Sequence, residues 1–476
     1  MSPDSPMTMV LPEQQVRERV HRLVPELWGT LADLVRHRSV AANPDPPLAV
    51  TAQTIAELFQ RAGLSSARVE TITHGDRTSA PLVLADEVAH AGVTTVLLYG
   101  HYDVQPADIT QWTTKPFEPI EKMDEHHDMR LYGRGAADDK SGVVMHLGAI
   151  KALRGDRGQI PLNIKLVLEG EEESGTSVLE QHLAANPDDP RFKADLVIIA
   201  DTGNVERGAP TLTETLRGII AADVVVETLS TKVHSGMYGG PVPDAFMALV
   251  QILASLQDPK TGDVAIPGLT QYDHTWPTVS EATYRRDAGV LPATSLIGSG
   301  TIAKLLYGKP SINVVGLSGL PLVSGAQNVL CPKAKAKISM RLAPNQDPDE
   351  AYALLESHIM SAAPWGLKPS VKRTASGSGF IASTTGEHSR VIERALLEAY
   401  HASTVAKAGQ GGSIPLVSAF QAANPEADIV LWGCEEPVAH AHGADESVSQ
   451  SELEHMTLAE ALLLQSVMSP IPIQSS

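Results

Sequence analysis

The sequence predicts an α/β fold, with a mixed, largely parallel sheet flanked by helices and with an inserted α+β domain. Three apolar runs carry the prediction: Val93–Gly100, Leu162–Gly170 and Ala194–Ala200. Continuous apolar runs of this length are typical of strands that are buried on both faces of a parallel sheet. Helical patterns alternate with them, as in βαβ units.

Two helices are predicted before the first of these strands. Glu13–Arg38 carries apolar residues at every third or fourth position, and Pro25 inside it predicts a break or a kink. Ala49–Ala62 reads as a second amphipathic helix. Strand-like pieces follow around Ala67–Ile72 and Pro81–Asp86.

From about residue 213 the pattern changes to that of a compact α+β unit. Its predicted strands and helices are Gly218–Leu229, Asp244–Leu256, Ser311–Leu317, Ala334–Leu342 and Asp349–Met360, with Asp244 as a helix N-cap. The alternation of helices and apolar strands then resumes, with a helix at Ser389–Tyr400, a strand at Ala427–Trp432 and a last helix at Ser451–Val467. We therefore expect one domain formed by residues 1–212 and 375–476, and an inserted domain at 213–374.

Composition restricts the possible partners and the compartment. The chain has 476 residues and a formal net charge of −19, which argues against a nucleic-acid or anionic-membrane partner. Its two cysteines, Cys331 and Cys434, form no C-x-x-C motif, so a reducing compartment is expected. The N-terminus does not resemble a signal peptide, and no apolar stretch is long enough to span a bilayer. We expect a cytoplasmic protein.

Charged residues follow each of the three predicted strands. His101 and Asp103 follow the first strand, Glu172 and Glu173 follow the second, and Asp201 follows the third. Because parallel sheets bind ligands outside the carboxyl ends of their strands, these side chains can converge on one edge. Several carboxylates crowded around a histidine need a cation to offset their repulsion.

Two adjacent acids, Asp138 and Asp139, lie in the Gly-rich stretch Leu131–Gly142 and add to this set. A site for two divalent metals about 3.5–4 Å apart needs a bridging carboxylate, terminal ligands and a general base. Asp138 could bridge the metals, and one of Glu172 and Glu173 could bind metal while the other handles a proton.

A second histidine ligand could be His440 or His442. Each residue also has an ordinary interpretation. Acids are common at helix starts, and a histidine at a strand end can simply be a satisfied core residue. The joint arrangement is what favours a metal site.

Four motifs together resemble a known family. They are His101–Pro106 (HYDVQP), Gly133–Lys140 (GRGAADDK), Glu169–Gly175 (EGEEESG) and His442–Glu446 (HGADE). In this order they are similar to the two-metal metallohydrolases that include carnosinase, cytosolic non-specific dipeptidase, carboxypeptidase G and the acyl-amino-acid deacylases. The resemblance implies a zinc-exopeptidase-like catalytic domain with an inserted lid and dimerisation domain.

The resemblance also implies roles for individual residues. One metal would be held by His101, Asp138 and Asp201, and the other by Asp138, Glu173 and His442. Glu172 would be the general base, Asp103 would support His101, and the peptide bond after Asp138 would be cis. The Asp445-Glu446 spacing favours His442 over His440.

In the inserted domain, His234 matches a lid histidine that reaches into the partner subunit's site and stabilises the oxyanion. The residues that resemble the part binding a peptide's C-terminal carboxylate are Arg341, Gly411, Gly412 and Ser413. These motifs point to the dipeptidase branch. Gln410 is a departure, because relatives commonly carry Glu there.

The expected function is hydrolysis of dipeptides with a free C-terminal carboxylate, by a metal-bridging water that Glu172 activates. The expected cofactors are two divalent metals per subunit, zinc or alternatively manganese. The expected assembly is a homodimer formed through the inserted domain. One alternative is an N-acyl amino acid deacylase or amidohydrolase of the same family. Another is an inactive metal- or peptide-binding relative, against which the presence of Glu172 argues.

Overall fold

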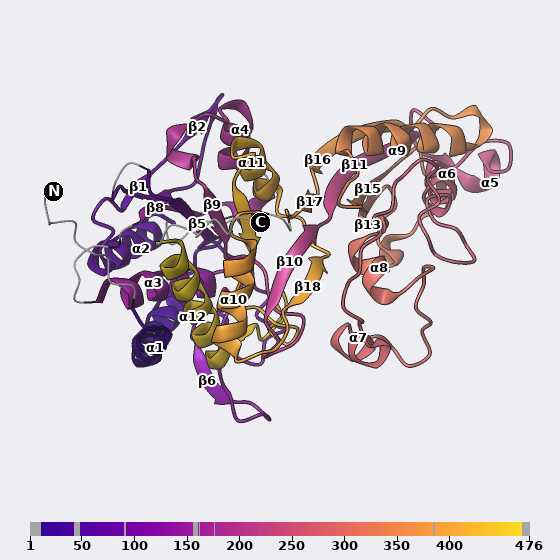
Figure 1. The fold of residues 1–476 in the computed structure, drawn as a ribbon. Helices are drawn as coiled ribbons and strands as arrows, with labels where there is room; N and C mark the ends of the chain where they lie inside the picture. Colours follow the sequence, from indigo (N-terminus) through magenta and orange to yellow (C-terminus); the bar gives the residue numbers. More distant parts are fainter. Residues whose placement is uncertain are drawn as a thin grey trace, which may run out of the picture. The chain divides into compact units, whose positions relative to one another are not determined.

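The computed structural model describes residues 11–41, 48–89, 92–155, 160, 162–175, 177–383 and 386–468 (Figure 1). The chain forms two compact units. The first comprises Met1–Glu214, Ala382–Ala408 and Ala419–Ser476, and the second comprises Thr215–Ile381 and Gly409–Ser418. Among the described helices, none is long and apolar enough to cross a membrane.

A six-stranded sheet forms the centre of the first unit. Its strands, in spatial order, are β1 (Arg68–Glu70), β4 (Leu82–Glu87), β8 (Asn163–Glu169), β5 (Thr95–His101), β9 (Leu196–Ile199) and β19 (Asp428–Leu431). The pairings from β8 through β19 are parallel, whereas β1–β4 and β4–β8 are antiparallel. The predicted mixed, largely parallel sheet is therefore confirmed.

Helices cover this sheet and bury its apolar side chains. They include α1 (Glu13–Arg36), α2 (Leu48–Ala62), α3 (Lys140–Arg154), α4 (Val178–Ala185), α10 (Ser389–Tyr400) and α12 (Gln450–Val467). α1, α3 and α12 pack against one another within one apolar cluster. Gly148 permits this approach, because a Cβ there would lie 2.7 Å from side-chain carbons of Leu27 and Thr457. Pro25 lies inside α1, which continues to Arg36, so the helix does not break.

Shorter elements complete the first unit. β6 (Ile120–Met123), β7 (Met129–Tyr132) and β20 (Ser447–Ser449) form a three-stranded sheet in the order β20-β7-β6. β2 (Thr73–His74) and β3 (Arg77–Thr78) form a hairpin. Pairing of β20 with β7 brings residues just before Ser447 alongside the residues that follow Tyr132.

The second unit has an antiparallel sheet in the order β13-β15-β11-β16. Its strands are β13 (Ser311–Ser318), β15 (Lys333–Leu342), β11 (Gly218–Glu227) and β16 (Ser370–Gly377). Helices α6 (Ala245–Ala254) and α9 (Pro348–Ala362) share one apolar cluster with β11 and β15. Alternate residues of β15 are buried, as expected when one face of a sheet is covered. The Asp244 carboxylate accepts a hydrogen bond from Met247 N at 3.0 Å, which confirms the predicted N-cap.

Several short elements had no clear sequence signal. They are α5 (Ser235–Tyr238), α7 (Glu281–Asp287), α8 (Ile302–Tyr307), α11 (Pro415–Ala423), β10 (Thr211–Leu216), β12 (Val233–His234), β14 (Val329–Leu330), β17 (Phe380–Ile381) and β18 (Ala406–Gln410).

Candidate metal and catalytic site

The parallel strands of the first unit end side by side, and this places the first ligand candidates. β5 and β8 run in register, so that His101 lies opposite Glu169. β9 pairs with the other side of β5, and Asp201 follows β9 by two residues. The His101 side chain is fully buried. The apolar run of each strand thus carries a polar residue to the same sheet edge.

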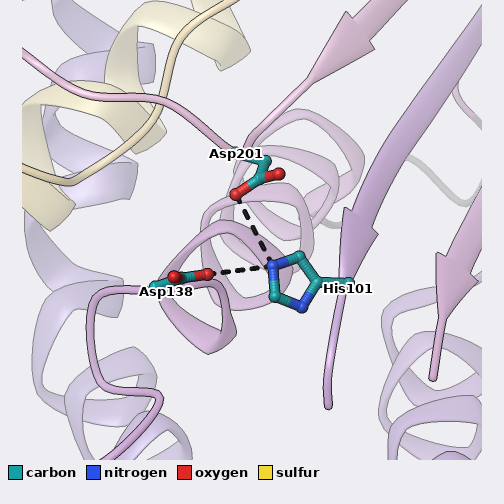
Figure 2. A group of neighbouring side chains, drawn as sticks. All are labelled: His101, Asp138 and Asp201. Atoms are coloured by element: carbon teal, nitrogen blue, oxygen red, sulfur yellow. Dashed lines mark ion pairs between the residues drawn. The ribbon is translucent and has the colours of Figure 1, made fainter. Parts of the chain in front are cut away.

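His101, Asp138 and Asp201 converge on one point (Figure 2). His101 Nε2 lies 2.9 Å from Asp138 Oδ1 and 3.5 Å from Asp201 Oδ1. Figure 2 shows both carboxylates directed at the same ring nitrogen, with Asp138 coming from the loop before α3.

A second group shares Asp138. His442 Nε2 lies 2.9 Å from Asp138 Oδ2 and 3.1 Å from Glu173 Oε2. The two oxygens of Asp138 therefore face two different histidines. His440 belongs to neither group of close potential ligands among the described residues.

The donors and charges of these groups suit divalent metal ions. Buried His101 Nε2 has no hydrogen-bond partner in the described part of the chain, although carboxylate oxygens surround it. Hydrogen bonds to Asp138 and Glu173 raise the pKa of His442 to about 11. Burial opposes protonation of His101, but Asp201, Asp103 and Asp138 still raise its pKa well above the ordinary value. A field that holds protons this strongly also favours cations, and imidazole with carboxylate is a common ligand set for zinc.

The Asp138 loop is fixed by the next residue, Asp139. The Asp138–Asp139 peptide bond is cis, as the resemblance implied. Asp139 caps α3 by accepting a hydrogen bond from Gly142 N at 3.2 Å, and it also accepts one from His101 N at 3.1 Å. A single buried carboxylate thus connects the start of α3 to the end of β5.

Glu446 holds the same loop from the other side. Its fully buried carboxylate accepts hydrogen bonds from the backbone N–H groups of Gly135, Ala137 and Asp138 at 3.0, 3.0 and 3.1 Å. It also pairs with Arg134 Nη1 at 2.6 Å. The sequence motif contained Glu446 but did not indicate this role.

Arg134 extends the connection to the second histidine. Its Nη2 donates to the carbonyl oxygens of His442 and Gly443 at 3.1 and 3.0 Å. His442 has φ of 60°, a left-handed conformation that is uncommon outside glycine. The guanidinium therefore supports a backbone turn that presents the imidazole to Asp138.

Asp103 connects His101 to the acidic tract after β8. Its Oδ1 lies 3.5 Å from His101 Nδ1. Its two oxygens accept hydrogen bonds from the backbone N–H groups of Glu172 and Glu173 at 3.2 and 3.0 Å. These two glutamates belong to a short 3-10 turn, Glu172–Ser174.

Glu172 and Glu173 differ in their side-chain contacts. The Glu173 carboxylate contacts His442 and accepts a hydrogen bond from Gln105 Nε2 at 2.8 Å. The Glu172 carboxylate has no such partner among the described residues, although it lies within the same group of charges. Burial raises the pKa of Glu172 well above its ordinary value; His101 lowers it, whereas Asp201, Glu173 and Asp138 raise it further.

Glu435 is a further acid at this site that the sequence interpretation missed. Its backbone forms a parallel bridge with Gly203, two residues beyond Asp201. Burial raises the pKa of its carboxyl group well above the ordinary value, and Asp138 and Asp201 add to this effect. Its position shortly after β19 is the same strand-end signal that identified Asp201.

The remaining predicted site residues lie in the second unit. His234 is exposed at the start of α5, and its Nδ1 accepts a hydrogen bond from Gly236 N at 3.1 Å. Arg341 on β15 donates from Nη1 to Ser413 Oγ at 2.9 Å. Gly411 and Gly412 precede Ser413 in the segment Gly409–Ser418.

Comparison with known proteins adds a family and several relatives. Residues 97–466 match the family described as Peptidase family M20/M25/M40. The chain is 36% identical over 445 residues to a cysteinylglycine-S-conjugate dipeptidase of Corynebacterium striatum, covering 92% of this chain and 94% of that protein. It is 30% identical over 360 residues to the Cys-Gly metallodipeptidase dug1 of Schizosaccharomyces pombe, covering 72% and 73%.

Solved structures share this fold over nearly the whole chain. The di-peptidase Dug1p of Saccharomyces cerevisiae superposes with a TM-score of 0.82 at 24% identity, covering 97% of this chain and 100% of that one. Human carnosine dipeptidase 1 superposes with a TM-score of 0.79 at 25% identity, covering 96% and 98%. The predicted α/β architecture with an inserted α+β domain is confirmed by these similarities.

Proposed function

The chain belongs to peptidase family M20/M25/M40, and on that basis we propose that it hydrolyses dipeptides with a free C-terminal carboxylate at the site built around Asp138. The predicted family, metallopeptidase chemistry and dipeptide hydrolysis are confirmed by the family match and by relatives that are dipeptidases. The residue roles, the metal and the assembly described below are our proposals.

One observation carries the proposed metal site: the two oxygens of Asp138 face His101 and His442. We assign His101, Asp138 and Asp201 to one divalent ion, and Asp138, Glu173 and His442 to the other. We propose zinc, with manganese as the alternative because oxygen-rich sites also suit it. When bound, two such ions polarise a carbonyl group and make water more acidic.

His101 is prepared to bind metal through Nε2. Its Nδ1 lies 3.1 Å from the Asp103 carbonyl oxygen and 3.5 Å from the Asp103 carboxylate. These acceptors favour a proton on Nδ1, which leaves the Nε2 lone pair directed at the other two ligands. We therefore propose that Asp103 orients His101, as acidic partners of metal-bound histidines commonly do.

Glu172 is the proposed general base. Its neighbour Glu173 is engaged with His442 and Gln105, whereas the Glu172 carboxylate has no ion-pair partner among the described residues. Asp103 accepts a hydrogen bond from the Glu172 backbone N–H and so fixes the backbone from which this carboxylate extends. Glu172 would take a proton from the attacking water and deliver it to the leaving amine.

His234 is the proposed oxyanion-stabilising group. Because Gly236 N–H donates to Nδ1, the neutral imidazole carries its proton on Nε2 and can donate it to an oxygen. The side chain is exposed, as needed for a residue that reaches a partner subunit's site. The proposal therefore includes a homodimer formed through the second unit.

Arg341 and Ser413, with Gly411 and Gly412, are proposed to bind the substrate's C-terminal carboxylate. Ser413 engages one guanidinium nitrogen of Arg341, and the others form no hydrogen bond with a described residue. A guanidinium can bind a carboxylate through two parallel hydrogen bonds. We also propose a cytoplasmic location, in keeping with two buried free cysteines.

The decisive experiment uses one preparation, stripped of metal and reloaded separately with zinc or manganese. It is assayed on a dipeptide panel and an N-acyl amino acid panel, with a Glu172→Gln preparation as the control for contaminating peptidases. Metal-dependent release of amino acids from dipeptides is expected. Cleavage of acylated amino acids alone would assign the chain to the deacylases, and no cleavage of either panel would contradict the proposal.

A further inference from the structure

A second arginine of the second unit, Arg217, is buried without an acidic partner. The residue is only 8% exposed. Its Nε donates to the Gly411 carbonyl oxygen at 3.1 Å, and its Nη1 donates to Ser311 Oγ at 3.0 Å and to the Lys309 carbonyl oxygen at 3.4 Å. All three partners are neutral. A buried charge is costly unless an opposite charge offsets it.

Other cations of this unit do have acidic partners. Lys309 Nζ lies 2.5 Å from Asp263, and Lys335 Nζ lies 2.7 Å from Asp223. In contrast, neither Arg217 nor Arg341 has a carboxylate within ion-pairing distance among the described residues. The other arginines of this unit, Arg285, Arg286 and Arg373, each pair with a carboxylate, so Arg217 and Arg341 are the exception among its arginines.

Arg217 and Arg341 lie beside each other. Ser311, which accepts a hydrogen bond from Arg217, is the cross-strand partner of Arg341 in the β13–β15 pairing. Ser413 connects them a second time, because its hydroxyl donates to the Arg217 carbonyl oxygen and accepts from Arg341. Burial and, next, the charge of Arg341 together lower the pKa of Arg217 to about 10. Two adjacent cations with no anion beside them strongly favour binding of an anion.

Gly411 leaves part of the Arg217 guanidinium group open to an anion. A Cβ at this position would lie 3.2 Å from Arg217 Nη2, so the absence of a side chain keeps this nitrogen uncovered. Nη2 forms no hydrogen bond with a described residue. The backbone of Gly411 thus holds the guanidinium through Nε while leaving Nη2 available.

We infer that Arg217 is a substrate-binding residue, which forms with Arg341 a two-guanidinium site for the C-terminal carboxylate of the substrate. This inference rests on the proposed function and adds a residue to it. One carboxylate between two guanidinium groups leaves one positive charge in excess. Dipeptides with an acidic C-terminal residue should therefore be cleaved more efficiently than their neutral isosteres, for example alanyl-glutamate compared with alanyl-glutamine.

The test compares alanyl-glycine with alanyl-glycinamide, which lacks the negative charge. Arg217→Gln should lower kcat/KM for alanyl-glycine about 10- to 100-fold, mainly through KM, because a hydrogen bond to a charged group is worth about 1.5–3 kcal/mol. For alanyl-glycinamide, the same substitution should lower kcat/KM less than about threefold. Arg217→Lys, which keeps the charge, should recover part of the loss. If the wild-type enzyme does not turn the amide over, its inhibition constant replaces kcat/KM.

Lys309→Gln is the matched control, because Lys309 lies beside Arg217 but is already paired with Asp263. It should affect both substrates equally, and thermal unfolding of every variant reports structural damage. Equal losses on both substrates for Arg217→Gln and Arg217→Lys, or no loss, would overturn the inference. A wild-type enzyme that cleaves no dipeptide would instead overturn the proposed function.

Discussion

Replacing Glu446 with glutamine tests whether the metal site is preorganised by a residue that binds no metal. The Glu446 carboxylate accepts hydrogen bonds from the N–H groups of Gly135, Ala137 and Asp138 and pairs with Arg134. Glutamine has the same shape, but its NH₂ group cannot accept a hydrogen bond. The substitution removes the negative charge and directs donors at donors within a fully buried site.

The expected loss can be estimated from these contacts. Removing one partner of a buried ion pair costs about 3–5 kcal/mol, because the other charge remains buried. Arg134 keeps its hydrogen bonds to the carbonyl oxygens of His442 and Gly443, which favours the lower end of that range. We therefore expect the free energy of unfolding to fall by about 3 kcal/mol. Metal affinity should fall about 10- to 100-fold, since Asp138 loses a backbone support.

Chemical denaturation measures the first quantity, and competition with a chelator measures the second. Asp428→Asn is the matched control. Asp428 is also buried and lies 2.8 Å from His388 Nδ1, but it occupies the start of β19, at the sheet edge opposite the metal site. This control should destabilise the fold and leave metal affinity unchanged. Wild-type metal affinity and turnover in Glu446→Gln would refute the reasoning.

Three further predictions concern the proposed chemistry. Glu172→Gln should lower kcat about 10²- to 10⁴-fold with metal content unchanged, whereas Glu173→Gln should lose metal; the opposite pattern would exchange their roles. His234→Ala should lower kcat about 10²- to 10³-fold with intact metal content, and unchanged turnover would exclude it from the mechanism. Removing metal with a chelator should stop turnover while the far-ultraviolet circular dichroism spectrum stays unchanged; loss of helical signal would show that the metals hold the fold together.

Local sequence patterns could predict the strand ends but not how the chain closes around them. Continuous apolar runs identify β5, β8 and β9, and parallel register then brings His101 and Asp201 to one edge. Which of His440 and His442 is the second histidine ligand was harder to predict, because the two residues are close in sequence and lie in one loop. Both also have a left-handed backbone conformation. The motif spacing favoured His442, and the hydrogen bond from Arg134 to its carbonyl oxygen supplies a physical reason.

Contacts between distant residues explain most of what the sequence did not reveal. Glu446 and Arg134 are 312 positions apart, and Arg217 meets Gly411 across 194 positions, so no local periodicity reports either contact. Pro25 shows that distant packing can also override a local sequence signal within a helix. Proline disfavours a helix interior, but the buried face of α1, including Leu27 and Leu31, packs on the core and the helix continues.

Three buried carboxylates that are not themselves proposed as metal ligands hold the backbone of residues that are. Asp139 accepts the His101 N–H, Asp103 accepts the Glu173 N–H, and Glu446 accepts the Asp138 N–H. Each fixes a ligand through its backbone, so the ligand side chains need not be held by one another. Because an approach of several carboxylates is unfavourable without a cation, we expect these backbone hydrogen bonds to offset part of that cost before metal binds. Substituting Asp103, Asp139 or Glu446 should therefore weaken metal binding without changing any atom that is proposed to contact the metal.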